Sequence, residues 1–340
     1  MGKNVAIIGA GSWGTALSIL LAKNGNRVKM WSVFNEEVTM LNELHEHVQK
    51  LPGVKVPAGV SCTGDVEEAL DGSDAVVMVV PSQTIRENAK LISSSIKKDQ
   101  IVVCCSKGIE EGTGMILTDI IQEEIPQSIA VALSGPSHAE EVARDIPTAV
   151  VAASERKEVA EYVQELFMSP NFRVYTNPDP RGVELGGALK NVIALCGGIS
   201  DGLGFGDNTK AALMTRGITE ISRLGIALGA QAQTFSGLAG LGDLIVTCTS
   251  MHSRNRRAGI LIGQGKTMEE AIAEVKMVVE GVTTAKAAHE LALKKNVSMP
   301  ITNEAYKVLF EGKNAKQAVV DLMTRDKTHE IEEIVQTLNW

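Results

Sequence analysis

A lysine and an asparagine stand side by side in the middle of an apolar segment of this chain. The segment, LGGALKNVIALCGG at residues 185–198, is almost entirely Gly, Ala and aliphatic residues around Lys190 and Asn191. A lysine that is buried without a partner carries a large desolvation cost. Two interpretations therefore stand: the lysine stem lies along apolar surface with its charge in water, or the ammonium is held in place for a purpose.

A glycine-rich loop near the start of the chain matches the G-x-G-x-x-G pattern of dinucleotide-binding turns. It reads GAGSWG, follows the apolar run VAII and opens the helical pattern SWGTALSILLAKNG. A strand before the loop and a helix after it are the context that this pattern requires. Gly9 allows the tight turn, Gly11 lets backbone amides approach a pyrophosphate, and Gly14 lets the helix pack against the strand.

The residues after the second expected strand leave the choice between NAD and NADP open. NAD-specific domains usually place Asp or Glu there to hold the ribose 2′-hydroxyl. This chain reads WSVFN at residues 31–35, and the first acid is Glu36. No arginine stands there for a 2′-phosphate, because Arg27 lies at the other end of the strand. We therefore expect NAD or NADP as the cofactor.

A cluster of cations interrupts an otherwise acidic protein. Residues 253–257 read SRNRR, whereas the whole chain has a formal net charge of -8. A phosphate dianion needs arginine and short polar donors, which this cluster offers. The negative net charge disfavours nucleic acid as a partner. We expect Arg256 and Arg257 to be surface charges or salt-bridge partners.

Two kinds of segment position these residues. Up to about residue 175, short β-branched runs alternate with amphipathic helical patterns, which is typical of a parallel sheet covered on both faces. After Pro178 and Pro180 helical periodicity takes over. We predict an α/β fold: an N-terminal Rossmann-type doubly wound, mostly parallel sheet in residues 1–180, an all-helical domain in 181–325, and a C-terminal tail, 326–340, without an assigned role.

The expected elements follow from these runs. Strands are expected at 4–8, 27–31, 74–80, 100–105, 129–133, 147–152 and 172–175. Helices are expected at 12–24, 35–46, 82–96, 113–124, 155–166, 181–195, 211–228, 267–276, 282–294, 300–311 and 315–324.

The cysteines and the N-terminus bear on the compartment. The chain has 5 cysteines with no CxxC or metal-ligand spacing, so we expect buried thiols, no metal and a reducing environment. The N-terminus leads directly into a strand without the features of a signal peptide. We find no apolar run as long as a membrane span. These observations predict a cytoplasmic protein with no integral membrane association.

Several sequence blocks together resemble the NAD(P)-dependent glycerol-3-phosphate dehydrogenases of the bacterial type. In chain order they are GAGSWGTAL, VVPS, SKGIE, LSGPSHAEEVA, GGALKNVIA, GLAGLGDLIVTCTS, SRNRR and VVEG, and the match runs from near residue 4 to about 324. The resemblance implies interconversion of dihydroxyacetone phosphate and sn-glycerol 3-phosphate, which feeds phospholipid synthesis. It also implies a substrate cleft between a Rossmann and a helical domain and, as in many members, a homodimer.

The resemblance also gives roles to single residues. It makes Lys190 the proton donor and acceptor, a role that suits a lysine whose pKa is lowered toward neutrality. Lys107 would lie near cofactor and substrate, and Asp243 would bond a substrate hydroxyl and hold the Lys190 ammonium. Asn191 would orient the lysine or a substrate hydroxyl. Thr247, four residues after Asp243, shares its face if that segment is helical.

The remaining assignments are binding contacts. The expected cofactor contacts are Gly9, Gly11, Ser12, Trp13, Gly14, Val33, Lys107, Ala139, Arg254, Val278 and Glu280. The expected substrate contacts are Lys107, Gly135, Ser137, Lys190, Asp243, Ser253, Arg254 and Asn255. His138 titrates near neutrality, but the family pattern gives it no role, and we expect it to line the cleft or cap a helix.

Other interpretations stay open. Lys107 could be a solvated loop lysine, Asp243 a helix N-cap, and Glu280 a helix-capping glutamate. The whole chain could be another two-domain dehydrogenase of the 6-phosphogluconate, 3-hydroxyacid or ketopantoate type, against which SRNRR and AGLGDL argue. It could also be a non-catalytic dinucleotide sensor, which would not need Lys107, Lys190, Asp243 and Arg254 together.

Overall fold

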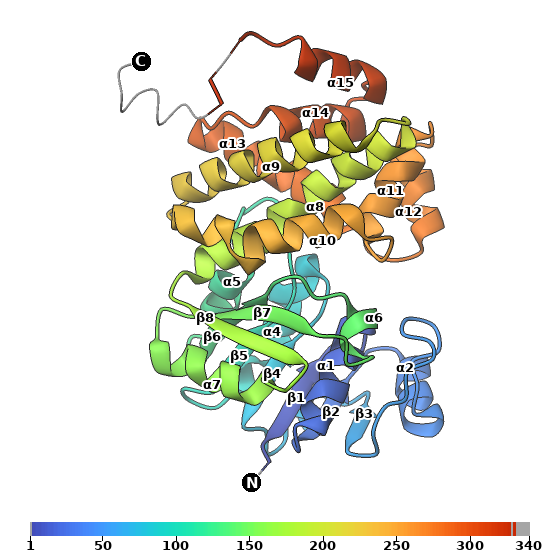
Figure 1. The fold of residues 1–340 in the computed structure, drawn as a ribbon. Helices are drawn as coiled ribbons and strands as arrows, with labels where there is room; N and C mark the ends of the chain where they lie inside the picture. Colours follow the sequence, from blue (N-terminus) through green and yellow to red (C-terminus); the bar gives the residue numbers. More distant parts are fainter. Residues whose placement is uncertain (1, 328, 331–340) are drawn as a thin grey trace.

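An eight-stranded sheet organises the N-terminal half of the chain. The computed structural model describes residues 2–327, 329 and 330, and it stacks the sheet part against a helical part (Figure 1). The strand order is β3-β2-β1-β4-β5-β6-β7-β8, with β6 and β7 antiparallel and the other neighbours parallel. The strands are β1 (Asn4–Ile8), β2 (Arg27–Trp31), β3 (Val60–Thr63), β4 (Ala75–Met78), β5 (Ile101–Cys104), β6 (Ile129–Ser134), β7 (Thr148–Ala153) and β8 (Phe172–Asn177).

Helices cover both faces of this sheet, which confirms the predicted fold class. Successive residues of β1 point to opposite faces, so Val5 packs in one apolar cluster with Leu17, while Ala6 packs in another with Ile85. The helices of this part are α1 (Ser12–Lys23), α2 (Asn35–Thr39), α3 (Val66–Leu70), α4 (Ile85–Ile92), α5 (Leu117–Glu124), α6 (Ala139–Val142) and α7 (Lys157–Phe167).

A long buried helix, α8 (Pro180–Gly202), begins the helical part. Its start carries two helix-initiating signals: the Asp179 side chain accepts a hydrogen bond from the N–H of Gly182, and Pro180 occupies the first turn. The other helices pack around it or on its neighbours. They are α9 (Asp207–Ala227), α10 (Asp243–Thr249), α11 (Arg254–Gly263), α12 (Met268–Val275), α13 (Glu280–Lys295), α14 (Pro300–Phe310) and α15 (Ala315–Met323).

Glycines bring the backbones of α8 and α11 into direct contact. A Cβ atom added to Gly198 would lie 2.1 Å from the carbonyl oxygen of Arg256, and one added to Gly259 would lie 2.1 Å from that of Leu195. Gly202 and Gly263 form the same kind of contact one turn further along. This crossing fixes the N-terminus of α11, where the SRNRR cluster begins, relative to α8.

The length of α8 corrects one sequence-based expectation. By length and composition this helix could cross a membrane, although we found no apolar run of that length in the sequence. In the structure, however, 94% of its apolar window is buried inside the protein. A mostly apolar helix suits such a central position, because its neighbours can cover it on every side. The five cysteines are all free thiols.

Candidate active site

The glycine loop joins β1 to α1 in the geometry that a dinucleotide requires. Gly9 has a φ of 111°, and its N–H donates to the Trp31 carbonyl oxygen over 3.0 Å. Gly11 is the N-cap residue of α1, and no side chain of the described residues caps this helix. A Cβ on Gly11 would have no described atom within 4 Å. The uncapped amides and this open space fit a pyrophosphate.

Three predicted residues meet at the carboxyl edge of the sheet. Lys190 on α8 donates to Asp243 Oδ1 over 2.7 Å and to Thr247 Oγ1 over 2.6 Å. Lys107, which follows β5, donates to the other oxygen of the same carboxylate, Asp243 Oδ2, over 2.7 Å and to the carbonyl oxygen of Gly135 over 2.8 Å. One carboxylate thus bridges two ammonium groups from different parts of the fold.

Burial sets the electrostatics of this cluster. Lys190 is 6% exposed and Asp243 is 1% exposed. Burial lowers the pKa of Lys190 to about 8, with Asp243 acting against this shift and Lys107 adding to it. Burial raises the pKa of Asp243, but the two lysines outweigh it and hold that pKa below its usual value. A lysine of this pKa can both give and take a proton near neutral pH.

Asp243 is held by the start of α10 and does not act as a helix cap. It is the first residue of that helix, and the N-cap position belongs to Gly242. Thr247 lies one turn later, where its hydroxyl donates to the Asp243 carbonyl oxygen over 2.6 Å and accepts from Lys190. The segment is therefore helical, which places Asp243 and Thr247 on one face, and Thr247 accepts a hydrogen bond from Lys190 directly.

A second polar chain joins α8, α11 and α13. The Asn255 side-chain amide donates to Asn191 Oδ1 over 2.9 Å, and its own Oδ1 accepts from the N–H of Gly281 over 2.8 Å. Asn191 also donates to the carbonyl oxygen of Gly187 over 3.5 Å. Within the described residues, no hydrogen bond joins the Asn191 side chain to Lys190. Asn191 thus fixes the helix that carries the lysine.

Some side chains of the SRNRR cluster make contacts within the protein, and others are left without a partner in the described residues. The Ser253 hydroxyl accepts from the N–H of Arg256 and caps α11. Arg256 pairs with Asp201, Nε to Oδ2, over 2.8 Å, which confirms it as a salt-bridge partner. Among the described residues, no hydrogen bond or salt bridge holds Arg254, and its pKa is lowered by burial. The Arg257 Nε is buried without a partner in the described part of the chain, where we expected a surface charge or a salt bridge.

Glu280 links the helical part to the sheet part. It opens α13 and accepts hydrogen bonds from the backbone N–H of Ser82, over 3.0 Å, and from the Ser82 hydroxyl. Ser82 follows β4, and a Cβ added to Gly108 would lie 2.4 Å from it. Glu280 therefore caps a turn across the two parts. Ser82 belongs to the VVPS block, but the sequence alone predicts no contact between it and Glu280.

The residues after β6 lie beside the lysine cluster. The Ser137 hydroxyl donates to the carbonyl oxygen of Gly135 over 2.9 Å, and Ala139 opens α6. His138 occupies the N-cap position of α6 but makes no capping bond, and its Nε2 is buried without a partner among the described residues. Its pKa is lowered by burial and then by Lys190, so the ring is neutral at pH 7.

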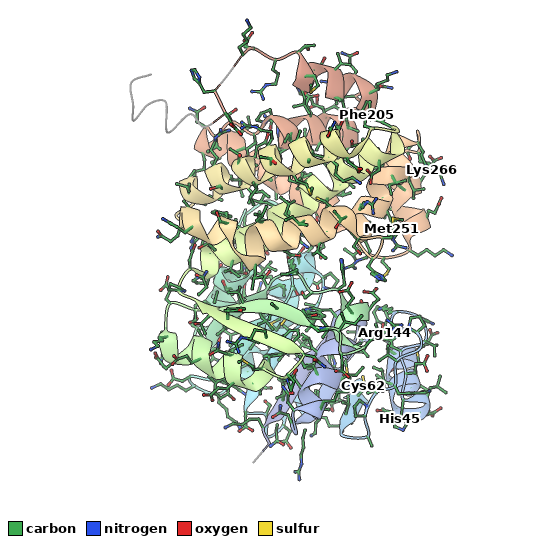
Figure 2. The ribbon with its side chains drawn as sticks, in the orientation of Figure 1. His45, Cys62, Arg144, Phe205, Met251 and Lys266 are labelled. Carbon is green, nitrogen blue, oxygen red and sulfur yellow. The ribbon has the colours of Figure 1, made fainter. Side chains whose placement is uncertain are left out.

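The loop between α10 and α11 closes one side of this region. The ring of His252 lies 5.6 Å from that of His138, centroid to centroid, and its Nδ1 lies 4.0 Å from a carboxylate oxygen of Glu140. Figure 2 shows the neighbouring Met251 at the edge of the helical part, across from Arg144 at the end of α6. Met251 is 58% exposed. The loop between α10 and α11 therefore lies against the start of α6.

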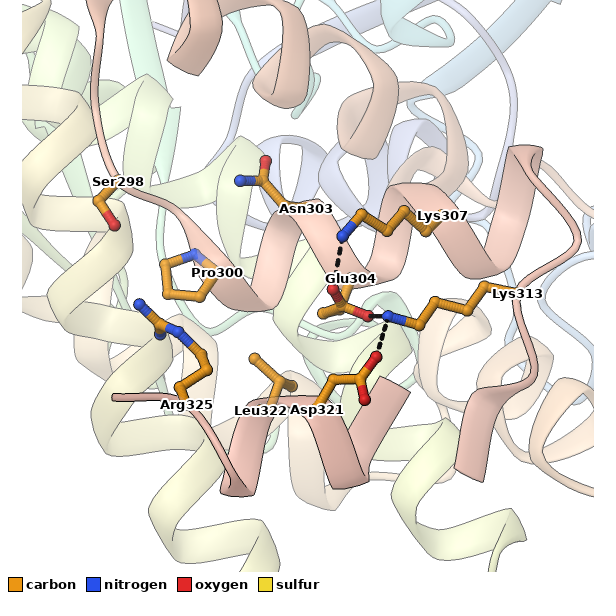
Figure 3. Close-up of a pocket in the computed structure, with 9 residues that line it drawn as sticks. All are labelled: Ser298, Pro300, Asn303, Glu304, Lys307, Lys313, Asp321, Leu322 and Arg325. Atoms are coloured by element: carbon orange, nitrogen blue, oxygen red, sulfur yellow. Dashed lines mark hydrogen bonds and ion pairs between the residues drawn. The ribbon is translucent and has the colours of Figure 1, made fainter. Parts of the chain in front are cut away.

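A separate pocket of about 390 Å³ lies between α14 and α15 (Figure 3). Its lysines are engaged, because Lys313 pairs with Glu304 and Asp321, and Lys307 pairs with Glu304. None of the predicted site residues lines it. The lining residues are Ser298, Pro300, Asn303, Glu304, Lys307, Lys313, Asp321, Leu322 and Arg325.

Two family descriptions match most of the chain. The N-terminal region of NAD-dependent glycerol-3-phosphate dehydrogenase matches residues 4–160, and the C-terminal region of the same family matches residues 179–320. The boundary between the two matches falls close to the start of α8.

Full-length relatives agree with this match. The glycerol-3-phosphate dehydrogenase [NAD(P)+] of Agathobacter rectalis is 58% identical over 325 residues, which cover 96% of this chain and 97% of the relative. The protein of the same name from Pelotomaculum thermopropionicum is 58% identical over 337 residues, covering 98% and 97%. The crystal structure of glycerol-3-phosphate dehydrogenase from Coxiella burnetii superposes with a TM-score of 0.92 at 38% identity, covering 95% of this chain and 99% of the other.

Proposed function

Because the chain belongs to the NAD-dependent glycerol-3-phosphate dehydrogenase family, we propose that the lysine cluster around Asp243 is its catalytic centre. The chain is an NAD(P)-dependent oxidoreductase that interconverts dihydroxyacetone phosphate and sn-glycerol 3-phosphate. One observation carries the assignment: a single buried carboxylate holds Lys190 and Lys107 at the carboxyl edge of the sheet. Ligands of doubly wound sheets bind at this edge.

In this proposal Lys190 transfers the proton. Reduction of the ketone places negative charge on its oxygen, and the Lys190 ammonium donates a proton to that oxygen. In the reverse direction, neutral Lys190 takes the proton of the alcohol. A pKa of about 8 allows both protonation states near neutral pH. Asp243 and Thr247 hold the ammonium group in position, so that it does not have to be ordered during the reaction.

Lys107 supplies a second positive charge beside the reacting oxygen. Its ammonium shares the Asp243 carboxylate and reaches the loop after β6 through the Gly135 carbonyl oxygen. A fixed cation stabilises the negative charge that develops on the substrate oxygen. It also keeps the pKa of Lys190 low, because two nearby ammonium groups disfavour each other's protonated form.

The substrate phosphate would bind at the start of α11. Arg254 is free of protein hydrogen bonds within the described residues, and the first turn of α11 presents backbone N–H groups beside it. Guanidinium and helix N-terminal amides are suited to a phosphate dianion. Ser253 and Asn255 flank Arg254 and complete the proposed phosphate site. Asn255 is anchored to Asn191, so the phosphate site is tied to the helix that carries Lys190.

The dinucleotide would occupy the edge of the sheet from the glycine loop to the lysine cluster. Ser12 and Trp13 begin α1 above Gly11, and Val33 follows β2 with 65% of its surface exposed. On the other side, Ala139, Arg254, Val278 and Glu280 are the proposed contacts. When bound, the nicotinamide supplies the hydride. The protein's own task is to bind the ketone, fix its phosphate and move the proton.

The cellular setting of the enzyme is also part of the proposal. We place it in the cytoplasm as a homodimer, acting on a small phosphorylated substrate whose reduced form supplies phospholipid synthesis. The division into a Rossmann domain, residues 1–180, and a helical substrate domain, residues 181–325, is supported by the start of α8 at Pro180. The tail, residues 326–340, extends beyond the described residues and receives no role.

A substrate panel tests the proposed function. Purified enzyme is given dihydroxyacetone phosphate, ketopantoate and a 3-oxo acid, each with NADH and with NADPH, and nucleotide oxidation is followed. We expect turnover of dihydroxyacetone phosphate with at least one nucleotide and no comparable rate with the other ketones. Preferred turnover of ketopantoate or the oxo acid would replace the proposal with another two-domain dehydrogenase. Nucleotide binding with no turnover of any substrate would favour a sensor.

A further inference from the structure

The turn from β6 to α6 contains a buried nitrogen atom that the described part of the chain leaves without a partner. The atom is Nε2 of His138. The residue stands at the N-cap position of α6, but its side chain makes no capping bond. A buried polar atom without a hydrogen bond costs free energy, so each such atom in a native protein calls for an explanation. A ligand that supplies the missing hydrogen bond is one explanation.

The ring of His138 lies close to the lysine cluster. Lys107 donates to the carbonyl oxygen of Gly135, three residues before the histidine, over 2.8 Å. Burial lowers the pKa of His138, and the charges of Lys190 and Lys107 lower it further, while Asp243 opposes them. Charges act on a pKa in this way only when they are near the titrating group. The imidazole therefore borders the place where the substrate oxygen is expected to react.

The helical part covers the other side of the ring. The centroid of the His252 ring lies 5.6 Å from that of His138, and the two rings are tilted by 52°. His252 directly precedes Ser253, the N-cap residue of α11. Its Nδ1 lies 4.0 Å from a carboxylate oxygen of Glu140. His138 is thus held at the junction of the sheet part and the helical part, where a cleft for the substrate is expected.

The substrate has one polar group without a partner in the proposed site. The phosphate of dihydroxyacetone phosphate is placed at the start of α11, beside Arg254. The carbonyl oxygen is placed beside Lys190 and Lys107. The remaining group is the free hydroxyl on the other side of the carbonyl carbon. A hydroxyl can donate one hydrogen bond and accept others, so it needs a polar atom in the protein.

Two residues expected to bind this hydroxyl are engaged within the protein. Each carboxylate oxygen of Asp243 accepts a hydrogen bond from a lysine, and the residue is 1% exposed. The Asn191 Oδ1 accepts from the side-chain amide of Asn255, and its own amide donates to the carbonyl oxygen of Gly187. In contrast, the Nε2 of His138 has no partner in the described part of the chain.

A second polar atom without a partner lies at the end of β6, but it faces away from an open space. Ser134 is 5% exposed, and its Oγ has no hydrogen bond among the described residues. A Cβ atom added to Gly187 would lie 2.6 Å from this oxygen. The Ser134 hydroxyl is therefore packed against the backbone of α8, and His138 is the better partner for a ligand.

We propose that His138 binds the free hydroxyl of dihydroxyacetone phosphate through Nε2 and thereby makes the enzyme specific for a ketone that carries this hydroxyl. A neutral imidazole either donates or accepts at Nε2, and a hydroxyl can complement both. A site built to bond a hydroxyl rejects an analogue without it, because the protein atom then stays unpaired. The inference rests on the proposed function, which supplies the substrate.

Two substrates isolate the hydroxyl. Dihydroxyacetone phosphate is compared with hydroxyacetone phosphate, in which a methyl group replaces the hydroxymethyl group, and kcat/KM is measured for both with the same nucleotide. We expect the wild-type enzyme to prefer dihydroxyacetone phosphate at least about tenfold. Equal values would overturn the inference and leave the proposed function standing. If neither compound is reduced, the proposed function fails and the inference fails with it.

Two substitutions assign the preference to His138. His138→Phe keeps a ring against His252 but has no nitrogen, so kcat/KM for dihydroxyacetone phosphate should fall about tenfold, with that for hydroxyacetone phosphate nearly constant. His138→Gln carries an amide that can reach the position of Nε2, and we expect it to restore most of the preference. An equal loss for both substrates would show that His138 only shapes the cleft. That result, or no loss at all, would overturn the inference.

Ser134→Ala is the matched control, because it removes the other unpartnered polar atom of this segment. We expect it to leave the ratio of the two kcat/KM values unchanged, and a shift as large as that of His138→Phe would contradict the role of His138. The Kd for NADH and thermal unfolding show whether each variant is intact. If His138→Phe does not fold, His138→Asn takes its place, because its shorter amide cannot reach the position of Nε2. It should show the same selective loss, and its absence would overturn the inference.

Discussion

At the scale of single residues, the chemistry depends on one carboxylate, Asp243, that is shared by two ammonium groups. Asp243 gives one oxygen to Lys190 and the other to Lys107. Its negative charge raises the pKa of Lys190, against burial and the repulsion of Lys107, which lower it. The value of about 8 is the balance of these effects. The cost of burying a lysine is thus used to bring its pKa into the range where a proton donor works.

The pH dependence of the two reaction directions follows from this balance. Reduction of the ketone needs protonated Lys190, so kcat/KM for this direction should fall as pH rises through about 8. Oxidation of the alcohol needs the neutral amine, so kcat/KM for that direction should rise over the same pH range. Asp243→Asn removes the carboxylate that raises the pKa of Lys190. We expect both midpoints to move to lower pH by about one unit or more.

The control for this prediction is Asp201→Asn. Asp201 lies on α8, the helix that carries Lys190, about 16 Å further along from the lysine, and it pairs with Lys210 and Arg256. Its loss should leave the midpoints in place. pH profiles of kcat/KM in both directions provide the measurement, and midpoints that do not move in Asp243→Asn would contradict the balance of charges described here.

At the scale of the elements, the crossing of α8 and α11 positions the phosphate site. Backbone contact at Gly198 and Gly259 sets the distance between the lysine and the N-terminus of α11. Gly259→Ala would place a methyl group 2.1 Å from the Leu195 carbonyl oxygen, so the helices must separate. We expect a loss of about 1–3 kcal/mol in the free energy of unfolding and a raised KM for dihydroxyacetone phosphate.

Gly197→Ala is the matched control for this crossing. A Cβ there would lie 3.9 Å from the Cys248 Sγ and 3.9 Å from Leu213, which is an ordinary contact. Alanine within a helix should stabilise the protein by about 0.5–1 kcal/mol. Thermal unfolding and KM are measured for both variants. If Gly259→Ala proves as stable as Gly197→Ala, the close crossing does not exist in solution.

The sequence predicted the central strands and the long helices but not β3, α10 or α11, for physical reasons. Continuous apolar runs mark the central strands, whereas the edge strand β3 gives no such run, because only Val60 and Cys62 of its four residues are buried. The short helix α10 reads DLIVTCT, whose β-branched residues give no helical signal. It is helical because it packs on α8. α11 starts with the polar RNRR and likewise depends on the crossing with α8.

The sequence predicted which residues form the candidate site better than it predicted which of them contact each other. Lys190, Asp243 and Lys107 stand in distinctive sequence blocks, and the structure brings them together. The pairing of Asn191 with Asn255 could not be read from the sequence, because it exists only through the packing of α8 against α11. The same holds for Glu280 and Ser82, which are 198 residues apart in the chain.

At the scale of the whole molecule, carboxylates from the helical part hold the sheet part. Glu184 on α8 accepts hydrogen bonds from the backbone N–H of Thr118, over 3.0 Å, and from its hydroxyl. Glu280 binds Ser82 in the same way. These two contacts fix how the two parts face each other across the site.

The link through Glu184 makes stability depend on pH. Burial raises the pKa of Glu184 to about 7, although Thr118 opposes the shift. Its contribution is therefore fully present below the ordinary value of 4.5 and is lost as pH rises through about 7. Glu184→Gln keeps a donor and an acceptor without the charge. Relative to wild type, we expect this variant to gain up to about 3 kcal/mol between pH 5 and pH 8.

Unfolding of wild type and variant across this pH range provides the measurement. Glu220, whose pKa burial also raises to about 7, is common to both proteins and cancels in the difference. Glu123→Gln removes an exposed carboxylate from the same helix, α5, and serves as the control, with no pH-dependent gain expected. A difference between Glu184→Gln and wild type that stays flat or falls with pH would contradict the buried, protonated link.

The most direct test of the central claim is to remove the proton donor and leave the rest of the site in place. Lys190→Met keeps the length and apolar character of the side chain but cannot transfer a proton. We expect NAD(P)H to bind with nearly unchanged Kd, while kcat for reduction of dihydroxyacetone phosphate falls by about a thousandfold, within the range for loss of a general acid. A variant that binds the nucleotide and keeps a kcat close to that of wild type would contradict the assignment of Lys190.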